Sequence, residues 1–369
     1  MKFLFITHNT SRSGAPKTML FFLNELKNKG YEFDVIALDG GALESQFSSV
    51  ASEFFSVNSF SKSIKYDLKS RIYKKLFNKK FESEYTNFIN KISSKHYDFI
   101  YVNTIVSLNL GIQLRKLMGV KLLLHLHELS TVIDEYVPDL KEKDLYVNQY
   151  IVPSTLNKKC LIDDFRIDEN KIEVIESVSE IDFSATNSKK QTNEFRVLMT
   201  GGAYWRKGDD LFIQIAKKVN SINSTIKFYW VGFSSEERKR VNRYDIKKTN
   251  LTDTVFFKPE QSDLRYWYQN SDIFLLPSRE DPFPLSAIEA GMFGLPILCF
   301  KDASGIASYL DEDCVFDYLD IDSVALKIVQ LFEDTLLVTE LGKKNKLMFQ
   351  RFTAKNQISK INNLITSIN

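Results

Sequence analysis

Short apolar runs alternate with helical patterns along most of the 369-residue chain, and this alternation constrains the fold more than any other feature. A strand buried on both faces of a parallel sheet reads as a short apolar run, and a helix usually returns the chain to the same edge. A polar segment at 184–194, rich in Ser, Thr, Asn, Lys and Gln, interrupts the series. The sequence therefore predicts an α/β protein with two doubly wound domains joined by a linker.

The apolar runs place the strands of each half. In the first half we expect strands at 3–7, 33–38, 99–103, 121–126 and 150–152, and a helix from Lys17 to Asn28 that ends at Gly30. In the second half we expect strands at 195–199, 226–231, 254–257, 273–276 and 297–300, with helical sequence after Ile321. Two such halves predict a ligand cleft between them, at the carboxyl ends of the strands.

The composition limits which binding partners and which cellular compartment we expect for this chain. The net charge of +2, from 49 Lys and Arg against 47 Asp and Glu, gives no reason to expect nucleic acid as a partner. The three cysteines (Cys160, Cys299 and Cys314) are widely spaced in apolar surroundings, which favours free thiols in a reducing compartment. The apolar run at the start is too short for a signal peptide, and none approaches a membrane span. We therefore expect a cytoplasmic protein.

The most informative turn follows the fourth predicted strand of the second half. We expect Pro284 to occupy the first helical position, which leaves the amides of Leu285 and Ser286 free to face an anion. Asp281 lies just before this helix and Glu289 lies within it. Two carboxylates on either side of a bare helix N-terminus suit a ligand with an anionic middle and hydroxyl-bearing ends, such as a nucleotide-sugar.

A glycine-rich turn, Gly201 to Gly208, follows the first strand of the second half and contains Arg206 and Lys207. Glycines permit close approach of the backbone to a ligand, and the two cations supply fixed positive charge for phosphate. When the bond between a sugar and a nucleoside diphosphate breaks, negative charge builds on the departing phosphate. Positive groups such as these two side chains can stabilise that charge. The alternative is an ordinary glycine-rich turn with two solvated cations.

Metal ligation is not expected from this sequence. His125 and His127 alternate at the end of a predicted strand and share one face, but no third zinc ligand occurs at a recognisable spacing. The acidic pairs at 311–313 and 320–322 have the pattern of loop or helix-start residues. We therefore predict no metal site and no cofactor.

The acidic turn resembles the signature of the retaining GT-B glycosyltransferases of family 4. That signature has two acidic residues separated by seven others, with Phe-Pro-Leu between them, and here it is Asp281, Phe283-Pro284-Leu285 and Glu289, followed by Gly294-Leu295-Pro296. The family usually has Glu at the first position, so Asp281 is a departure. Glu280 is an alternative, although the Phe-Pro register favours Asp281.

The resemblance implies roles for these residues. It implies that Glu289 binds the ribose of the donor, that Asp281 binds the donor sugar, and that Lys207 contacts the diphosphate. The family has an Arg directly after the first glycine, where this chain has Gly202, so Arg206 is the expected substitute. His127 matches the strand-end His that contacts the transferred sugar; the alternative is a hydrogen-bonded structural His.

Two further turns match the pattern of the family, and each contains one residue that differs from it. Gly14 lies in the glycine turn after the first strand, where the family commonly has two glycines and this chain has Ser13. Lys258 and Pro259 match the nucleobase loop, where a Gly usually takes the place of Pro259. Because Pro has no amide donor, the identity of the base stays open.

The resemblance implies two Rossmann-like domains, an N-terminal acceptor-side domain at 1–183 and a C-terminal nucleotide-sugar-binding domain at 195–349, with a last helix near 350–369 that packs back on the first. It implies metal-independent transfer of a sugar, with retention, from a nucleoside-diphosphate donor to a hydroxyl of a glycan or lipid-linked acceptor, in cell-surface polysaccharide synthesis. The alternatives are a GT-B epimerase acting on a nucleotide-sugar and a catalytically silent subunit that binds nucleotide-sugar or glycan.

A basic stripe at 62–80 has apolar residues at helical spacing, with many lysines and only one acid. Such a helix could lie on an anionic membrane at the inner face of the cell, as suits an enzyme extending a lipid-linked glycan. The alternative is a surface helix that packs its apolar stripe on the first domain.

Overall fold

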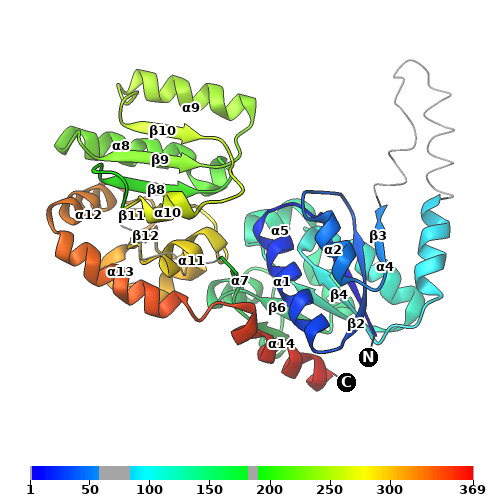
Figure 1. Cartoon of the computed structure of the whole chain (residues 1–369). Coiled ribbons are helices and arrows are strands. Elements are labelled where there is room, and N and C mark those ends of the chain that lie inside the picture. Colours follow the sequence, from blue (N-terminus) through cyan, green and yellow to red (C-terminus); the bar gives the residue numbers. More distant parts are fainter. Residues whose placement is uncertain (1, 58–83, 182–189, 369) are drawn as a thin grey trace, which may run out of the picture. The chain divides into compact units, whose positions relative to one another are not determined.

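The structure is a computed structural model that describes residues 2–57, 84–181 and 190–368. The described chain divides into two compact units (Figure 1). Unit 1 comprises Met1–Glu176 and Gln357–Asn369, and unit 2 comprises Ser177–Asn356. The basic stripe at 62–80 lies outside the described residues.

The described strands of unit 1 form a seven-stranded parallel sheet. In spatial order they are β3 (Phe54–Ser56), β2 (Glu32–Ala37), β1 (Lys2–Thr7), β4 (Phe99–Asn103), β5 (Lys121–His125), β6 (Gln149–Val152) and β7 (Ile172–Val174). The order reverses between β1 and β4, which is the switch point of a doubly wound sheet.

Alternation along β1 and β4 gives the two faces of this sheet different side chains. On one face Phe3 packs against Phe99 with ring centroids 4.5 Å apart, and Phe5 packs against Tyr101 at 4.9 Å. Leu4 on the other face belongs to an aliphatic core. Both faces are buried, because helices cover a parallel sheet on both sides. The named helices are α1 (Gly14–Asn28), α2 (Glu44–Val50), α4 (Leu108–Met118), α5 (Ser130–Tyr136), α6 (Leu140–Lys143), α7 (Thr155–Asp163) and α14 (Ala354–Ile368), and 84–93 is also helical.

The described strands of unit 2 form a six-stranded parallel sheet. Their spatial order is β10 (Val255–Lys258), β9 (Lys227–Val231), β8 (Arg196–Thr200), β11 (Ile273–Leu276), β12 (Ile297–Phe300) and β13 (Val315–Phe316). The switch point of this sheet lies between β8 and β11. Two doubly wound parallel sheets confirm the predicted fold class.

The helices of unit 2 are α8 (Asp209–Ile222), α9 (Glu236–Lys248), α10 (Arg265–Gln269), α11 (Leu285–Met292), α12 (Ile321–Glu333) and α13 (Thr335–Phe349). Helix α12 packs against α8, and α11 packs against α13 (Figure 1). The close approach of α11 and α13 depends on Gly291, since a Cβ there would collide with the ring of Phe349.

Several sequence-based boundaries need correction. Helix α1 begins at Gly14 and not at Lys17, because Pro16 is tolerated in the first turn, where its missing amide has no intrahelical partner to lose. Strands β3, β7 and β13 were not predicted. All three are only two or three residues long and only partly buried, so they carry almost no periodic signal. The three cysteines are free and buried, as predicted.

Candidate functional site

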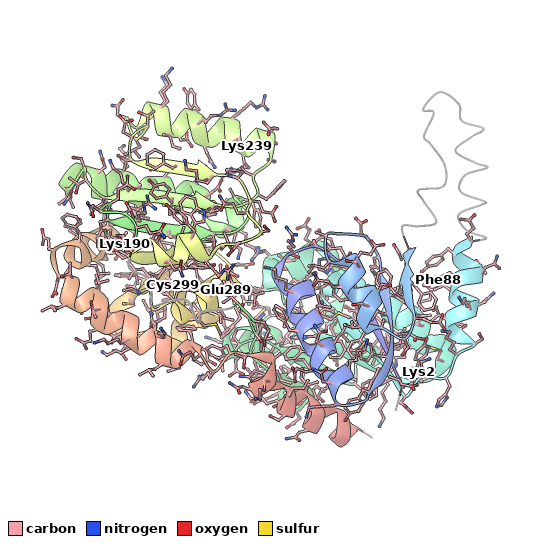
Figure 2. The ribbon with its side chains drawn as sticks, in the orientation of Figure 1. Lys2, Phe88, Lys190, Lys239, Glu289 and Cys299 are labelled. Atoms are coloured by element: carbon pink, nitrogen blue, oxygen red, sulfur yellow. The ribbon has the colours of Figure 1, made fainter. Side chains whose placement is uncertain are left out.

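Most of the predicted site residues of unit 2 lie at its switch point. The loop after β8 and the turn after β11 leave neighbouring strands where the strand order reverses. In open α/β sheets this position, beyond the carboxyl ends of the strands, is where ligands bind. Figure 2 shows the side chains of this unit and labels Glu289 on α11.

A glycine brings the loop and the turn into contact. Gly208 has φ +73°, and a Cβ there would lie 2.0 Å from the carbonyl oxygen of Pro277. Only glycine accepts this close approach together with the left-handed conformation. The amide of Arg279 then donates to the carbonyl of Arg206 at 2.8 Å. The turn therefore rests directly on the short 3₁₀ segment Trp205–Lys207.

Lys207 and Asp281 form an ion pair across this contact, and both side chains are largely buried. Ser278 also donates to Asp281 from its Oγ, at 3.3 Å. Arg206 donates from Nη1 to the carbonyl of Glu280 at 2.6 Å. The fold thus brings together the two predicted cations and the first predicted carboxylate, residues that lie more than seventy positions apart in the sequence.

The start of α11 differs from the prediction by one residue. Pro284 is the N-cap, with φ −70° and ψ 125°, and the first helical residue is Leu285. The amides of Ala287 and Ile288 donate to the carbonyl of Pro284. The amides of Leu285 and Ser286 precede these bonds, as the first amides of a helix do, and they carry its positive dipole end. The correction leaves these two amides as the expected anion donors.

Glu289 is held by two hydroxyl groups. Its Oε2 accepts from the hydroxyl of Tyr268 at 2.9 Å, and its Oε1 accepts from Ser179 at 3.0 Å. The Tyr268 hydroxyl is also 2.9 Å from Oγ1 of Thr200. Burial, and after it the negative charge of Glu289, raise the pKa of Tyr268 well above its usual value. Tyr268 is therefore a neutral donor that fixes the carboxylate.

Lys258 and Pro259 lie at the end of β10, two strands away from β8 in the sheet. The carbonyl of Lys258 accepts from the amide of Gly232 at 3.1 Å, so this loop is tied to the loop after β9. The Lys258 ammonium lies 5.5 Å from the ring centre of Phe256. Pro259 is exposed. The structure thus places this pair at the same edge of the sheet as Gly201, beyond an intervening strand.

Sequence reasoning missed the groups that brace the loop after β8. Arg279 makes two hydrogen bonds of 2.8 Å to the carboxylate of Asp210 in α8, and a third to the carbonyl of Trp205. Arg238 and Asn242 in α9 both bind the buried Asp209. Arg279 lies two residues before Asp281, but nothing in the sequence shows that it turns back to α8.

The second cluster of polar groups lies at the switch point of unit 1. His127 follows β5, and its Nε2 is 2.9 Å from Oδ1 of Asn103. The side-chain Nδ2 of Asn103 donates to the carbonyl of Ala15, near the start of α1, at 3.2 Å. Gly14 is the exposed first residue of that helix. The fold therefore connects the two predicted site residues of unit 1 through Asn103.

Two further residues of this cluster were not predicted. Thr104 has φ +77°, which is rare for a β-branched residue and marks local backbone strain. Its hydroxyl is 3.2 Å from Nδ1 of His8. Burial lowers the pKa of His8 to about 4 and that of His127 to about 3, the latter with a further contribution from His8. Both imidazoles are therefore neutral near pH 7.

His125 has a structural role. Its Nδ1 is 2.6 Å from the hydroxyl of Tyr101, and its ring packs on that of His127 with centroids 3.9 Å apart.

The acidic pairs at 311–313 and 320–322 also have structural partners, since Asp311 binds Lys344 and Asp320 caps α12. Among the described residues, no group of three or more His, Cys, Asp or Glu side chains is arranged to hold a metal ion.

The fold of the chain follows from comparison with solved structures. The crystal structure of Anabaena Alr3699/HepE in complex with UDP and glucose matches all of this chain and all of that one, with a TM-score of 0.79 and 17% identity. A lipopolysaccharide outer core galactosyltransferase, WaaB, matches with a TM-score of 0.70 and 15% identity, again over the full length of both chains. The two units together therefore have the GT-B fold.

Residues 180–348, nearly all of unit 2, match the family model described as Glycosyl transferases group 1. Through this unit the chain is similar to that family. An uncharacterized glycosyltransferase of Haemophilus influenzae is 28% identical over 163 residues, which are 42% of this chain. The O-antigen biosynthesis glycosyltransferase WclY of Escherichia coli is 26% identical over 168 residues. The matched part covers 44% of the length of each of these two relatives.

Proposed function

We propose that the protein is a retaining glycosyltransferase that moves a sugar from a nucleoside-diphosphate donor to a hydroxyl of a glycan or lipid-linked acceptor. The observation that carries the proposal is the ion pair of Lys207 and Asp281, which joins the loop after β8 to the turn before α11. A cation, a carboxylate and the first amides of α11 together match a ligand with phosphate and sugar parts.

Each residue has a chemical task in this proposal. The cations of Arg206 and Lys207 and the amides of Leu285 and Ser286 meet the charge that develops on the departing diphosphate. Asp281 accepts hydrogen bonds from sugar hydroxyls, and Glu289 accepts them from the ribose. His127, through its neutral imidazole, binds the transferred sugar. Gly14, Gly201, Lys258 and Pro259 supply backbone surface for the donor.

The similarities support the choice of donor and the setting. UDP is the nucleotide named in the HepE complex, and we propose a UDP-sugar as the donor here. WclY acts in O-antigen biosynthesis and WaaB in the lipopolysaccharide outer core, which supports a role in cell-surface polysaccharide synthesis. Among the described residues, no helix is both long and apolar enough to cross a membrane. We propose a cytoplasmic location, with peripheral contact to the membrane through 62–80.

The proposal does not require a metal ion, since protein cations and helix amides meet the diphosphate charge. We expect turnover to survive exhaustive treatment with EDTA. Loss of activity in EDTA that Mg²⁺ or Mn²⁺ restores would contradict this arrangement of charges.

The decisive experiment is incubation with a panel of UDP-, GDP- and ADP-sugars, with and without oligosaccharide acceptors. Transfer, or slow hydrolysis of one donor with retention, is the expected result. An isomerised donor sugar would indicate an epimerase, and binding without turnover would indicate a silent subunit. The matched variants are Asp281→Asn, which we expect to lose activity, and Asp263→Asn, which removes an exposed carboxylate paired with Arg265.

A further inference from the structure

Three aromatic side chains of unit 2 are exposed at the same edge of its sheet as the candidate site. Tyr204 and Trp205 follow β8 and are 41% and 55% exposed, and Phe233 follows β9 and is 61% exposed. The amide of Ala203 donates to the carbonyl of Phe233 at 2.7 Å, so the two loops lie side by side. Exposed aromatic side chains gathered next to a candidate site mark an interaction surface.

The ring of Trp205 is held in place from one side. The guanidinium of Arg279 lies 4.9 Å from its ring centre, and Arg279 is itself fixed by two hydrogen bonds to Asp210. Arg279 also donates to the carbonyl of Trp205 at 2.8 Å. A ring positioned before binding loses little conformational entropy when a ligand packs on it.

Tyr204 is fixed in a similar way. Its ring lies against Gly202, where a Cβ would collide with it. The guanidinium of Arg206 is 5.7 Å from its ring centre. Tyr204 and Trp205 therefore form two positioned aromatic surfaces, each with a guanidinium beside it.

The charges beside these rings favour a neutral ligand. Asp210 balances the charge of Arg279, the cation beside the ring of Trp205. The cation beside Trp205 is therefore already paired and offers little to a polyanion, and three rings are too small a surface to insert into a membrane. A sugar ring fits, because its C–H face packs on an aromatic face while its hydroxyls bond to neighbouring polar groups.

We propose that Tyr204, Trp205 and Phe233 form a subsite for a sugar ring of the acceptor glycan. This inference rests on the proposed function, in which Lys207, two residues after Trp205, holds the donor together with Asp281. It assigns acceptor contacts to unit 2, and it predicts that acceptors longer than a monosaccharide bind more tightly.

Trp205 is a built-in reporter for the test. The other tryptophans, Trp230 and Trp267, are 0% and 7% exposed, so iodide in solution quenches chiefly the fluorescence of Trp205. We expect oligosaccharides of glucose, galactose, mannose or N-acetylglucosamine to shield it, with at least one of the four lowering the quenching. Trp205→Phe should remove the quenchable component. Shielding by none of the four, or shielding by UDP alone, would overturn the proposal.

Kinetics provide the second readout. Trp205→Ala should raise the KM for the acceptor by about three- to tenfold, and Trp205→Phe should restore most of the loss, because an aromatic face is kept. The control is Tyr244→Ala, which removes a similarly exposed aromatic ring from α9 and should change neither KM. An effect of Trp205→Ala on the donor KM alone would overturn the subsite. Failure of the parent protein to bind any nucleoside diphosphate in calorimetry would instead overturn the proposed function.

Discussion

Replacing Gly208 by alanine should have two effects: it should destabilise unit 2, and it should displace the residues of the candidate site. Gly208 adopts φ +73°, a conformation that costs an L-residue about 1 to 2 kcal/mol. The added Cβ would also lie 2.0 Å from the carbonyl oxygen of Pro277 and 2.9 Å from its carbon. Because the obstacle is backbone, it cannot rotate away, and such overpacking costs about 1 to 3 kcal/mol. The two effects together predict a loss of about 2 to 5 kcal/mol in the free energy of unfolding.

A second glycine of the same unit separates these two effects. Gly294 has φ +80°, but its nearest neighbour for an added Cβ is the carbonyl oxygen of Gly342 at 3.4 Å, an ordinary contact. Gly294→Ala should therefore lose only the conformational part, about 1 to 2 kcal/mol. The difference between the two variants measures the collision with Pro277.

Urea unfolding followed by tryptophan fluorescence is the appropriate assay, since all three tryptophans lie in unit 2 and report on it alone. Calorimetry with UDP should show, in addition, that Gly208→Ala binds at least tenfold more weakly, because Lys207 and Asp281 are pushed apart. Equal destabilisation by the two variants, or a Gly208→Ala protein as stable as the parent, would refute the reasoning.

Three further predictions concern other parts of the chain. Glu289→Ala should weaken UDP binding by about 1 to 3 kcal/mol in calorimetry, the value of hydrogen bonds to a charged group, and unchanged affinity in a folded variant would remove Glu289 from the site. The depressed pKa values of His8 (about 4) and His127 (about 3) mean that the unfolded chain binds protons below pH 6.5 that the folded unit refuses. The stability of unit 1 should thus be greatest above pH 6.5 and fall from there towards pH 4. Urea midpoints by circular dichroism that do not change between pH 7 and 5 would contradict it. Exchanging the lysines at 74, 75, 79 and 80 for Gln should abolish co-sedimentation with anionic liposomes at low salt, where each cation contributes about 1 kcal/mol, with neutral liposomes as the control.

The alternation of short apolar runs was sufficient to predict both sheets, because strands such as β1 and β11 are buried on both faces and must be apolar throughout. Strand β7 could not be predicted in the same way. Its three residues include the exposed Glu173, and its place in the sheet depends on pairing with β6. Edge strands of this length are decided by the neighbouring strand and not by their own sequence.

Residues of the candidate site could be predicted from the sequence only where they belong to a recognisable motif. The residues of the acidic turn were identified from Asp281 and Glu289, yet the partners of Glu289 were not, since Ser179 lies 110 positions away and outside any motif. Thr104 is a clearer case. Its positive φ has no signal in the sequence, because a threonine there would normally be assigned an extended conformation.

The structure also supplies a physical reason for the departure at Gly202. An arginine at this position, as the resembling family has, would carry a Cβ into the space that the ring of Tyr204 occupies. The loop therefore accommodates either a side chain at 202 or the ring of Tyr204 in its present place. With the ring in place, the positive charge of the loop comes from Arg206, whose guanidinium lies beside that ring and donates to the carbonyl of Glu280. The glycine, the tyrosine and the relocated arginine thus form one coupled change that keeps a second cation, besides Lys207, at the acidic turn.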